Sequence, residues 1–501
     1  MYISKMRLKN FRCFDGEHSF SFGPGINYFV GNNNAGKTTI FRAIEFLKSG
    51  KTKEGWITEG RNDEDVYVEI TIEGTQLKEL LEVDNLKKYQ PYLIDGSKLR
   101  LRRGSETTTW IDKRNREKEI TIKNIAIYNP NSDIFENPTG VDNVISALFD
   151  AQFVYSDLDN SEFQNFSKTT TIAGKLISAI TKDFQTSPEW SNFKEAHSRA
   201  FGSSGFTGVL NGLKTKIENI LEEQYGSTTV DFNFGVPTIE NFLKTGQILL
   251  EENGIQTDVA EKGTGMQRAL ALTLIQIYAE IGQKNLDVSK PIFFFLDEPE
   301  TFLHPTAQDK LLESLGKLSE DNQIFITTHS PYLLRNFCKD TNTLSIFSRK
   351  SGIPRVQEGV SLNLFPYSPS WGEINYKAFG VVSPEFHNEL FGMLHKKAEE
   401  NEVHYNGKSK VDQSILSFDR WLIEQDKDNS TDSNHINCKN IEKIEEGRFD
   451  KSMSTYIRNY IDHPGDDVHL PQGKKREKPT MEDIRKSIDS MMKIYKDNFT
   501  S

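Results

Sequence analysis

Cysteine is scarce in this chain of 501 residues, which contains only Cys13, Cys338 and Cys438. An odd, widely spaced set of this kind argues against a disulfide framework and against a zinc cluster. Long apolar runs are also missing, since no stretch approaches the roughly 20 continuous apolar residues that cross a bilayer. The opening residues, MYISKMRLKNFRCF, lack the apolar core of a signal peptide, so we expect a cytoplasmic protein with no membrane partner.

An excess of positive charge is lacking as well. The 61 basic and 72 acidic residues give a net charge of -11, so the molecule as a whole does not attract polyanions. Binding to nucleic acid would need a local basic patch, which the bulk charge neither shows nor excludes. Apolar residues make up 36% and charged residues 27%, a normal mixture for a globular chain, and the length suggests roughly two to four domains.

Apolar strand patterns alternate with helical patterns along the first two thirds of the chain. The run 26–30 is a short apolar strand that enters a glycine-rich turn, and PIFFFLDEPE (291–300) and QIFITTHS (323–330) read as buried strands. This order predicts an α/β domain with a mixed, mostly parallel sheet, and alternating runs such as 66–74 predict an antiparallel β-subdomain beside it. The expected divisions are a first half of this α/β domain (1–140), a helical arm or lid (141–226), a second half of the α/β domain (227–345) and a helical C-terminal domain (366–501).

The turn after the first apolar strand has the composition of a phosphate-binding loop. GNNNAGKTT (31–39) fits G-x-x-x-x-G-K-[ST] and lies between a strand and a helix start, where a chance match is improbable. Glycines let the backbone N–H groups face phosphate oxygens, Lys37 adds a positive charge, and the Thr38 hydroxyl should ligate Mg²⁺. The residues expected to bind ATP here are Asn32, Asn33, Asn34, Ala35, Gly36, Lys37, Thr38 and Thr39.

Acidic and histidine side chains follow the two later core strands. Asp297 and Glu298 end a very apolar strand, where two adjacent acids are costly without a cation beside them. A magnesium nucleotide supplies that cation, so we expect Asp297 to hold Mg²⁺ and Glu298 to activate the attacking water. His329 ends the next strand and is expected to contact the γ-phosphate and to act in catalysis with Lys37. The alternatives are a strand that simply ends in acids and a structural histidine.

A second glycine turn, EKGTGMQRAL (261–270), precedes another helix. Its glycines leave backbone N–H groups accessible at a helix start, and Thr264 offers a hydroxyl beside Gly265. One ATP does not need two such cradles from the same subunit. The economical interpretation is that this turn contacts the γ-phosphate of ATP held by a partner subunit, although glycine turns before helices are common.

Together these motifs resemble ABC-type ATPases of the RecF, SMC and OLD group (AAA15/AAA21-like), compact bacterial ATPases often found in anti-phage defence. The matching pieces are KMRLKNFRCF, GNNNAGKTT, GTGMQR, LDEPETFLHP and TTHSPYLL, spread from residue 1 to about 340. The resemblance implies a P-loop ATPase that forms head-to-tail dimers, or higher oligomers, around two ATP molecules. It implies that Thr264 and Gly265 act across the dimer and that the segment after Glu300 faces the partner. Gln152 is a weak candidate for the glutamine of the lid loop.

The C-terminal part departs from that resemblance. Many OLD-type proteins carry a Toprim nuclease there, but no matching acidic set follows residue 340, and GDD at 465–467 lacks an apolar strand before it. Instead, Arg458, Asn459 and His463 look like the R-x4-6-H motif of HEPN domains, many of which are metal-independent RNases. His463 would act as general base, Arg458 would stabilise the pentavalent phosphate and Asn459 would orient them. The alternative is an arginine and a histidine that cap a helix end and pair with acids such as Asp462.

Three functions remain open at this point. The first is an ATP-binding and hydrolysing sensor or scaffold subunit of a bacterial anti-phage system, similar to the ATPases of Septu and PARIS systems, that controls a separate nuclease effector. The second is an ATP-gated RNase with the HEPN-like site in the same chain. The third is a RecF-like DNA-repair ATPase that binds duplex DNA through the arm.

Overall fold

The computed structural model describes most of the chain, and each statement below is confined to the part it describes. The residues outside that part are 84–85, 113, 139, 144–147, 157–173, 175–176, 178–180, 182–183, 240, 242–245, 247, 285–290, 336, 360–364, 366–368, 428–438, 444–446, 464–477 and 500–501. Cys438 and the GDD triplet at 465–467 therefore lie outside the described residues. Cys13 and Cys338 are free thiols. Among the described helices, none combines the length and the apolar character needed to span a bilayer.

One six-stranded sheet has the order β2-β1-β4-β5-β8-β9. Its β1–β2, β5–β8 and β8–β9 pairs are antiparallel, as alternating polar and apolar side chains predict. The strands are β1 (Tyr2–Phe11), β2 (Phe14–Ser21), β4 (Tyr67–Glu73), β5 (Lys98–Gly104), β8 (Ala126–Asn129) and β9 (Ile134–Glu136). A separate hairpin joins β6 (Thr108–Ile111) to β7 (Glu117–Ile120).

The other six-stranded sheet has the order β10-β13-β14-β3-β15-β16. The β10–β13 and β3–β15 pairs are parallel and β15–β16 is antiparallel, so the sheet is mixed. Every residue of β3, β13 and β14 is buried, in keeping with their largely apolar sequences. The strands are β10 (Asp150–Val154), β13 (Ile292–Asp297), β14 (Gln323–Thr328), β3 (Ile26–Gly31), β15 (Thr343–Lys350) and β16 (Ile353–Glu358). The predicted α/β class with a mixed sheet and an antiparallel β-subdomain is confirmed.

The chain divides into two compact units. One comprises Met1–Ser4, Leu47–Thr52 and Glu69–Ile326, and the other comprises Lys5–Phe46, Lys53–Val68 and Thr327–Ser501. The aromatic rings of Phe153, Phe295 and Phe325 stack in series inside the first unit, with centroids 4.8 and 4.7 Å apart. Stacked rings of this kind add specific packing to the burial of a large apolar area.

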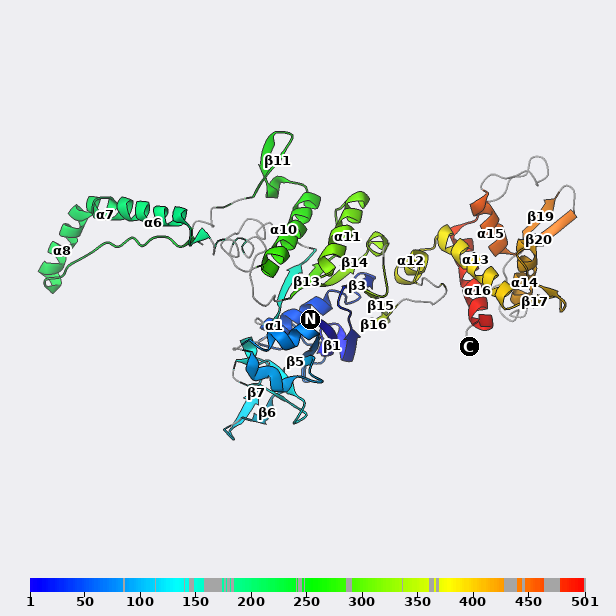
Figure 1. The fold of residues 1–501 in the computed structure, drawn as a ribbon, viewed down its shortest axis with the longest axis horizontal. Helices are drawn as coiled ribbons and strands as arrows, with labels where there is room; N and C mark the ends of the chain where they lie inside the picture. Colours follow the sequence, from blue (N-terminus) through cyan, green and yellow to red (C-terminus); the bar gives the residue numbers. More distant parts are fainter. Residues whose placement is uncertain are drawn as a thin grey trace. The chain divides into compact units, whose positions relative to one another are not determined.

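The described helices between residues 75 and 320 belong to the first unit, and Figure 1 labels α10 and α11 among them. Helices α6, α7 and α8 fall in the range expected to form an arm or lid. None of their described residues is buried. Strand β10 lies in that same range and pairs with β13, so part of residues 141–226 belongs to the sheet. The remaining elements of this region are α2 (Thr75–Leu80), η1 (Lys87–Tyr92), η2 (Val141–Asn143), α6 (Pro188–Phe201), α7 (Phe206–Val209), α8 (Asn211–Tyr225), β11 (Leu249–Glu252), β12 (Ile255–Asp258), η3 (Val259–Glu261), α10 (Thr264–Lys284) and α11 (Pro305–Ser319).

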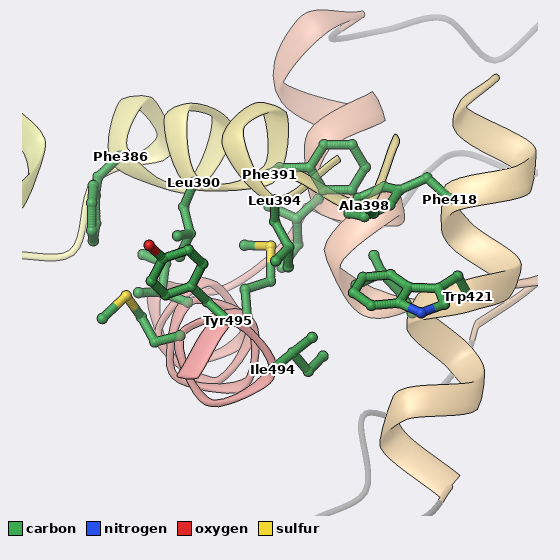
Figure 2. Close-up of a cluster of buried hydrophobic side chains, with 14 of the residues drawn as sticks. Phe386, Leu390, Phe391, Leu394, Ala398, Phe418, Trp421, Ile494 and Tyr495 are labelled. Atoms are coloured by element: carbon green, nitrogen blue, oxygen red, sulfur yellow. The ribbon is translucent and has the colours of Figure 1, made fainter. Parts of the chain in front are cut away.

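The second unit carries α1 up to Phe46 and ends in a helical bundle with its own core. Figure 2 shows Phe386, Leu390 and Leu394 on one face of α13, directed at Tyr495 and its neighbours on α16. The range expected to form a helical C-terminal domain, 366–501, contains helices α12 to α16. The elements are α1 (Thr39–Ser49), η4 (Pro331–Leu334), α12 (Trp371–Phe379), α13 (Pro384–Glu400), α14 (Ile415–Lys427), α15 (Met453–Asp462) and α16 (Met481–Phe499), with the short hairpins β17 (His404–Tyr405) with β18 (Ser409–Lys410) and β19 (Lys439–Lys443) with β20 (Gly447–Lys451).

Helix α12 begins at a full capping box. The Ser370 hydroxyl accepts from the Glu373 N–H, and the Glu373 carboxylate accepts from the Ser370 N–H. Trp371, the first residue of the helix, donates its indole N–H to the carbonyl of Pro331 at 3.2 Å. That bond joins α12 to η4, which directly follows the segment containing His329.

Candidate nucleotide site

The phosphate loop is shaped by two glycines that no other residue could replace without strain. Gly31 ends β3 at φ +133°, and a Cβ there would lie 1.8 Å from the carbonyl oxygen of Phe347. Gly36 has φ +101°, and its Cβ would lie 2.8 Å from the sulfur of Cys13. Both positions need the positive φ and the close approach that glycine alone tolerates. The backbone between them is therefore free to turn around an anion.

The residues between these glycines separate into an exposed tip and a buried base. Asn32, Asn33 and Asn34 are exposed, whereas Ala35 is buried. Thr38 is half-buried just before α1 begins at Thr39. The Thr39 hydroxyl is buried and lies 3.3 Å from the sulfur of Cys13, so it faces the protein interior. Thr38 is therefore the better placed of the two hydroxyls for a ligand at the helix start.

Lys37 and His329, predicted from separate motifs, are brought together. The buried Lys37 ammonium donates to the carbonyls of Gly31 at 2.9 Å and Asn32 at 3.1 Å. It also lies 2.8 Å from Nε2 of His329. An ammonium can only donate, so this imidazole nitrogen accepts and the ring carries its proton on Nδ1. The geometry places a cation and a proton-bearing ring at the mouth of the glycine loop.

The two acids at the end of β13, Asp297 and Glu298, differ in burial and in backbone conformation. Asp297 is 7% exposed, and its Oδ2 accepts from the Ser156 hydroxyl at 3.4 Å. Glu298 is half-buried in the left-handed conformation, with φ +47°, and accepts from the Thr301 hydroxyl at 3.4 Å. A non-glycine residue in that conformation is uncommon and is found most often where function demands it. The pair thus forms one buried and one accessible carboxylate.

Arg268 is a residue of this region that the sequence reasoning missed. It lies on α10, is 2% exposed, and donates to the carbonyl of Asp297 at 2.7 Å and to that of Ser156 at 3.5 Å. Burial lowers the pKa of its guanidinium, and the carboxylates of Glu300, Asp297 and Glu298 oppose that shift. The available signal was a single arginine, in GTGMQR, ahead of an otherwise apolar helix.

The second glycine turn packs against the segment that follows the acids. Thr264 is exposed as the first residue of α10. A Cβ on Gly265 would lie 2.9 Å from the carbonyl of Phe302. Phe302 itself is 69% exposed at φ +66°. We call residues 298–303 the acid loop, because this segment begins at Glu298, directly after β13. Its two left-handed residues are Glu298 and Phe302.

Gln152, the candidate for a lid-loop glutamine, lies in the middle of β10. It is buried, its backbone is paired with Phe294, and its side chain donates to Asp150. A lid residue needs a mobile backbone, whereas this one is fixed in a ladder. The structure therefore places Gln152 in the sheet rather than in a loop.

The C-terminal candidate residues gather at the end of α15. Arg458 makes a 2.7 Å ion pair with Asp462 and donates to the amide oxygen of Asn459 at 3.1 Å. Asp462 also accepts from Asn388 at 2.8 Å. His463 is exposed, and within the described residues its ring makes no hydrogen bond to Arg458. This arrangement matches the alternative interpretation, in which Arg458 pairs with Asp462.

The residues present fit a magnesium nucleotide. Among the described residues, no group of three or more His, Cys, Asp or Glu side chains could hold a metal by itself. Magnesium seldom uses such a cage, because it keeps several waters and is bound through one or two carboxylates and the phosphates of its substrate. Thr38 and Asp297, the ligands predicted from the sequence, carry the hydroxyl and carboxylate oxygens that such an ion prefers.

A buried parallel strand, a glycine loop with a lysine at a helix start, and an acid pair ending a second buried strand define a P-loop ATPase of the ABC type. The RecF, SMC and OLD group to which the sequence pointed is confirmed by comparison with known proteins. Residues 26–335, more than half of the chain, match the family described as "AAA domain, putative AbiEii toxin, Type IV TA system". The chain belongs to this family.

Curated relatives include two nucleases and a repair protein. The chain is 29% identical over 357 residues to the Old nuclease of Escherichia phage P2, covering 66% of this chain and 58% of the nuclease. It is 22% identical over 432 residues to the endonuclease GajA of Bacillus cereus, covering 69% and 60%. A stretch of 52 residues, 10% of this chain and 15% of the relative, is 46% identical to RecF of Francisella tularensis subsp. novicida. The matches to the two nucleases thus span less than two thirds of their lengths.

Proposed function

We propose that this chain binds and hydrolyses ATP, with Lys37 and the backbone of residues 31–38 holding the phosphates. The observation that carries the proposal is the Lys37 ammonium at the mouth of a loop whose two glycines leave no room for a Cβ. Its present partners are two loop carbonyls and a histidine nitrogen, which terminal phosphate oxygens would replace as stronger acceptors. Nε2 of His329 would then donate to the phosphate oxygen that displaces it from Lys37, once the ring proton has moved from Nδ1 to Nε2.

Asp297 and Glu298 divide the remaining work between them. Magnesium, held by Thr38 and Asp297, would neutralise charge on the phosphate oxygens. Glu298 accepts a proton from the attacking water as its oxygen bonds to the γ-phosphorus and the bond to ADP breaks. The half-buried position of Glu298 suits this role, because the carboxylate stays accessible to water while Asp297 beside it is buried.

The active site is completed by a second copy of the chain. Thr264 is exposed at a helix start beside the half-buried Gly265, and its hydroxyl and the Gly265 N–H can contact the γ-phosphate held by a partner. Phe302 is 69% exposed and its carbonyl lies beside Gly265, so a partner seated on this turn would also cover the Phe302 ring. ATP would thus hold two subunits together, because one nucleotide would contact both of them.

Phosphate release by the purified full chain tests the proposal. Lys37→Ala should abolish binding of a fluorescent ATP analogue, because the loop loses its only side-chain cation. Glu298→Gln should bind ATP, turn over at least about 100-fold more slowly, and accumulate dimers in light scattering. Lys317→Ala, which removes an exposed lysine on α11, is the matched control. Turnover by a strict monomer at a concentration-independent specific rate would contradict the shared site.

The biological role we propose is that of a sensor or scaffold subunit in anti-phage defence, in which ATP-driven closure controls a separate nuclease effector. The support is membership of the ATPase group and similarity to a phage-encoded Old nuclease and to GajA, together with the lack of a Toprim acid set in the sequence after residue 340. Expression of the chain with and without its genomic neighbours during phage challenge tests this role. Protection by the chain alone, with nucleic-acid cleavage by the purified chain, would refute the need for an effector.

The RNase alternative is less well supported, because the Arg458 guanidinium already pairs with Asp462. A phosphate would have to displace that carboxylate, which Asn388 also holds. RNA cleavage by the wild-type chain that is lost in His463→Ala and retained in Glu298→Gln would restore this alternative.

A further inference from the structure

Arg268 occupies a position where an arginine is hard to bury. Only 2% of it is exposed, and its two terminal nitrogens donate to carbonyl oxygens rather than to carboxylates. Within the described residues its Nε has no hydrogen-bond partner. A buried guanidinium with an unused donor costs free energy, so a purely structural purpose would be served better by an apolar side chain. The two carbonyl contacts that Arg268 makes indicate its role.

The shorter of these contacts fixes the peptide bond that leads into Glu298. The Asp297 carbonyl, which accepts from Arg268 at 2.7 Å, belongs to the same rigid plane as the Glu298 N–H. Rotation of that plane changes φ of Glu298, which stands at +47°. The guanidinium therefore holds the one backbone unit whose orientation decides where the Glu298 carboxylate points.

The position of Arg268 on α10 adds a second connection. The helix begins at Thr264, and residues four apart lie on the same face, one turn from each other. In the same turn, Gly265 lies against the carbonyl of Phe302 in the acid loop. The first turn of α10 thus contacts the acid loop near both of its ends.

We propose that Arg268 is a positioning residue, which holds the peptide of Glu298 and links the helix start that contacts the partner's ATP to this subunit's own water-activating carboxylate. The inference rests on the proposed function, because it assumes that Glu298 activates water. It adds the physical connection by which a nucleotide on one subunit controls hydrolysis on the other. A shift of α10 that lengthens the Arg268 to Asp297 contact would release the left-handed Glu298 and misdirect its carboxylate.

Kinetics of three full-length variants test the role. Arg268→Gln should lower kcat about 10- to 100-fold with the KM for ATP unchanged within about 2-fold, because misplacing a catalytic group by an ångström costs about that much. Arg268→Lys should recover part of the loss, since an ammonium can still donate to one carbonyl. Arg355→Gln, at an exposed position on β16, is the matched control and should equal wild type.

A double variant separates positioning from a general effect on the fold. If Arg268 acts through Glu298, adding Arg268→Gln to Glu298→Gln should change the residual rate by less than about 2-fold. Equal losses in both backgrounds, or an unchanged kcat in Arg268→Gln, would overturn the proposal. Should the glutamine variant fail to fold, the lysine variant decides by the same comparison.

These outcomes also distinguish the inference from the proposed function itself. If the wild-type protein showed no ATP turnover, or if Glu298→Gln were fully active, both the proposed function and the positioning role would be refuted. Normal wild-type turnover, an inactive Glu298→Gln and a fully active Arg268→Gln would remove the positioning role alone.

Discussion

A buried histidine makes the C-terminal bundle sensitive to acid. His387 on α13 is 0% exposed, with Nε2 2.9 Å from the Ser487 hydroxyl on α16 and Nδ1 3.2 Å from the side-chain oxygen of Asn388. Burial lowers its pKa from 6.5 to about 4, against smaller upward effects from Asn388 and Asp462. Charging this ring therefore opposes the packing of α13 on α16.

The sign and size of the effect follow from that pKa. Because the folded-state value is the lower one, the unfolded chain binds more protons between pH 4 and 6.5, so stability falls as the pH drops through this window. The full loss is about 3 kcal/mol, and the part between pH 7 and pH 5 is about 2 kcal/mol. That part corresponds to an opening equilibrium about 20-fold larger at pH 5.

Hydrogen exchange of the amides of α13 and α16, corrected for intrinsic rates, measures this opening in the full chain. His387→Gln keeps a hydrogen-bonding side chain without a titrating group, so the variant should lose the additional 20-fold acceleration. His395→Gln, a half-buried histidine on the same helix, is the control and should keep it. Parallel pH profiles for wild type and His387→Gln would refute the reasoning.

Three further predictions concern the remaining structure. Thr264→Arg should leave ATP binding intact and lower turnover about 100-fold, because it damages only the partner's site; phosphate release and analogue binding measure the two effects. Glu69→Gln should destabilise the chain by about 2 kcal/mol in thermal unfolding, because one buried carboxylate holds two arginine side chains at 2.8 and 2.6 Å. Gly265→Ala should lower turnover without loss of ATP binding, since its Cβ would press on the Phe302 carbonyl, whereas Gly316→Ala meets nothing within 4 Å and should be neutral.

The sequence was sufficient to predict the strands and loops whose chemistry is local. The glycine spacing around Lys37 and the apolar run ahead of Asp297 are properties of adjacent residues, and the structure has a loop and a strand at those places. The Arg458–Asp462 pair was also open to prediction, because residues four apart on a helix face each other.

Features that depend on distant partners could not be predicted in the same way. Strand β10 has only five residues, and its place in the sheet is decided by β13, far along the chain. The carbonyl contacts of Arg268 depend on how α10 packs, which no local pattern specifies. The pairing of Lys37 with His329 joins two motifs that the sequence could interpret only one at a time.

The acid loop contains two non-glycine residues in a strained backbone conformation. Glu298 and Phe302 both adopt left-handed conformations, at φ +47° and +66°, and each costs about 1–3 kcal/mol in a non-glycine residue. Such strain persists only where surrounding contacts determine it. Some of these contacts lie within the loop or come from Gln308 on α11, which donates to the Leu303 carbonyl at 3.1 Å, and others come from Arg268 and Gly265 in the first turn of α10. The shape of the loop therefore depends in part on the position of α10. Because the same turn presents Thr264 to a partner, whatever the partner holds there acts on the loop that carries Glu298.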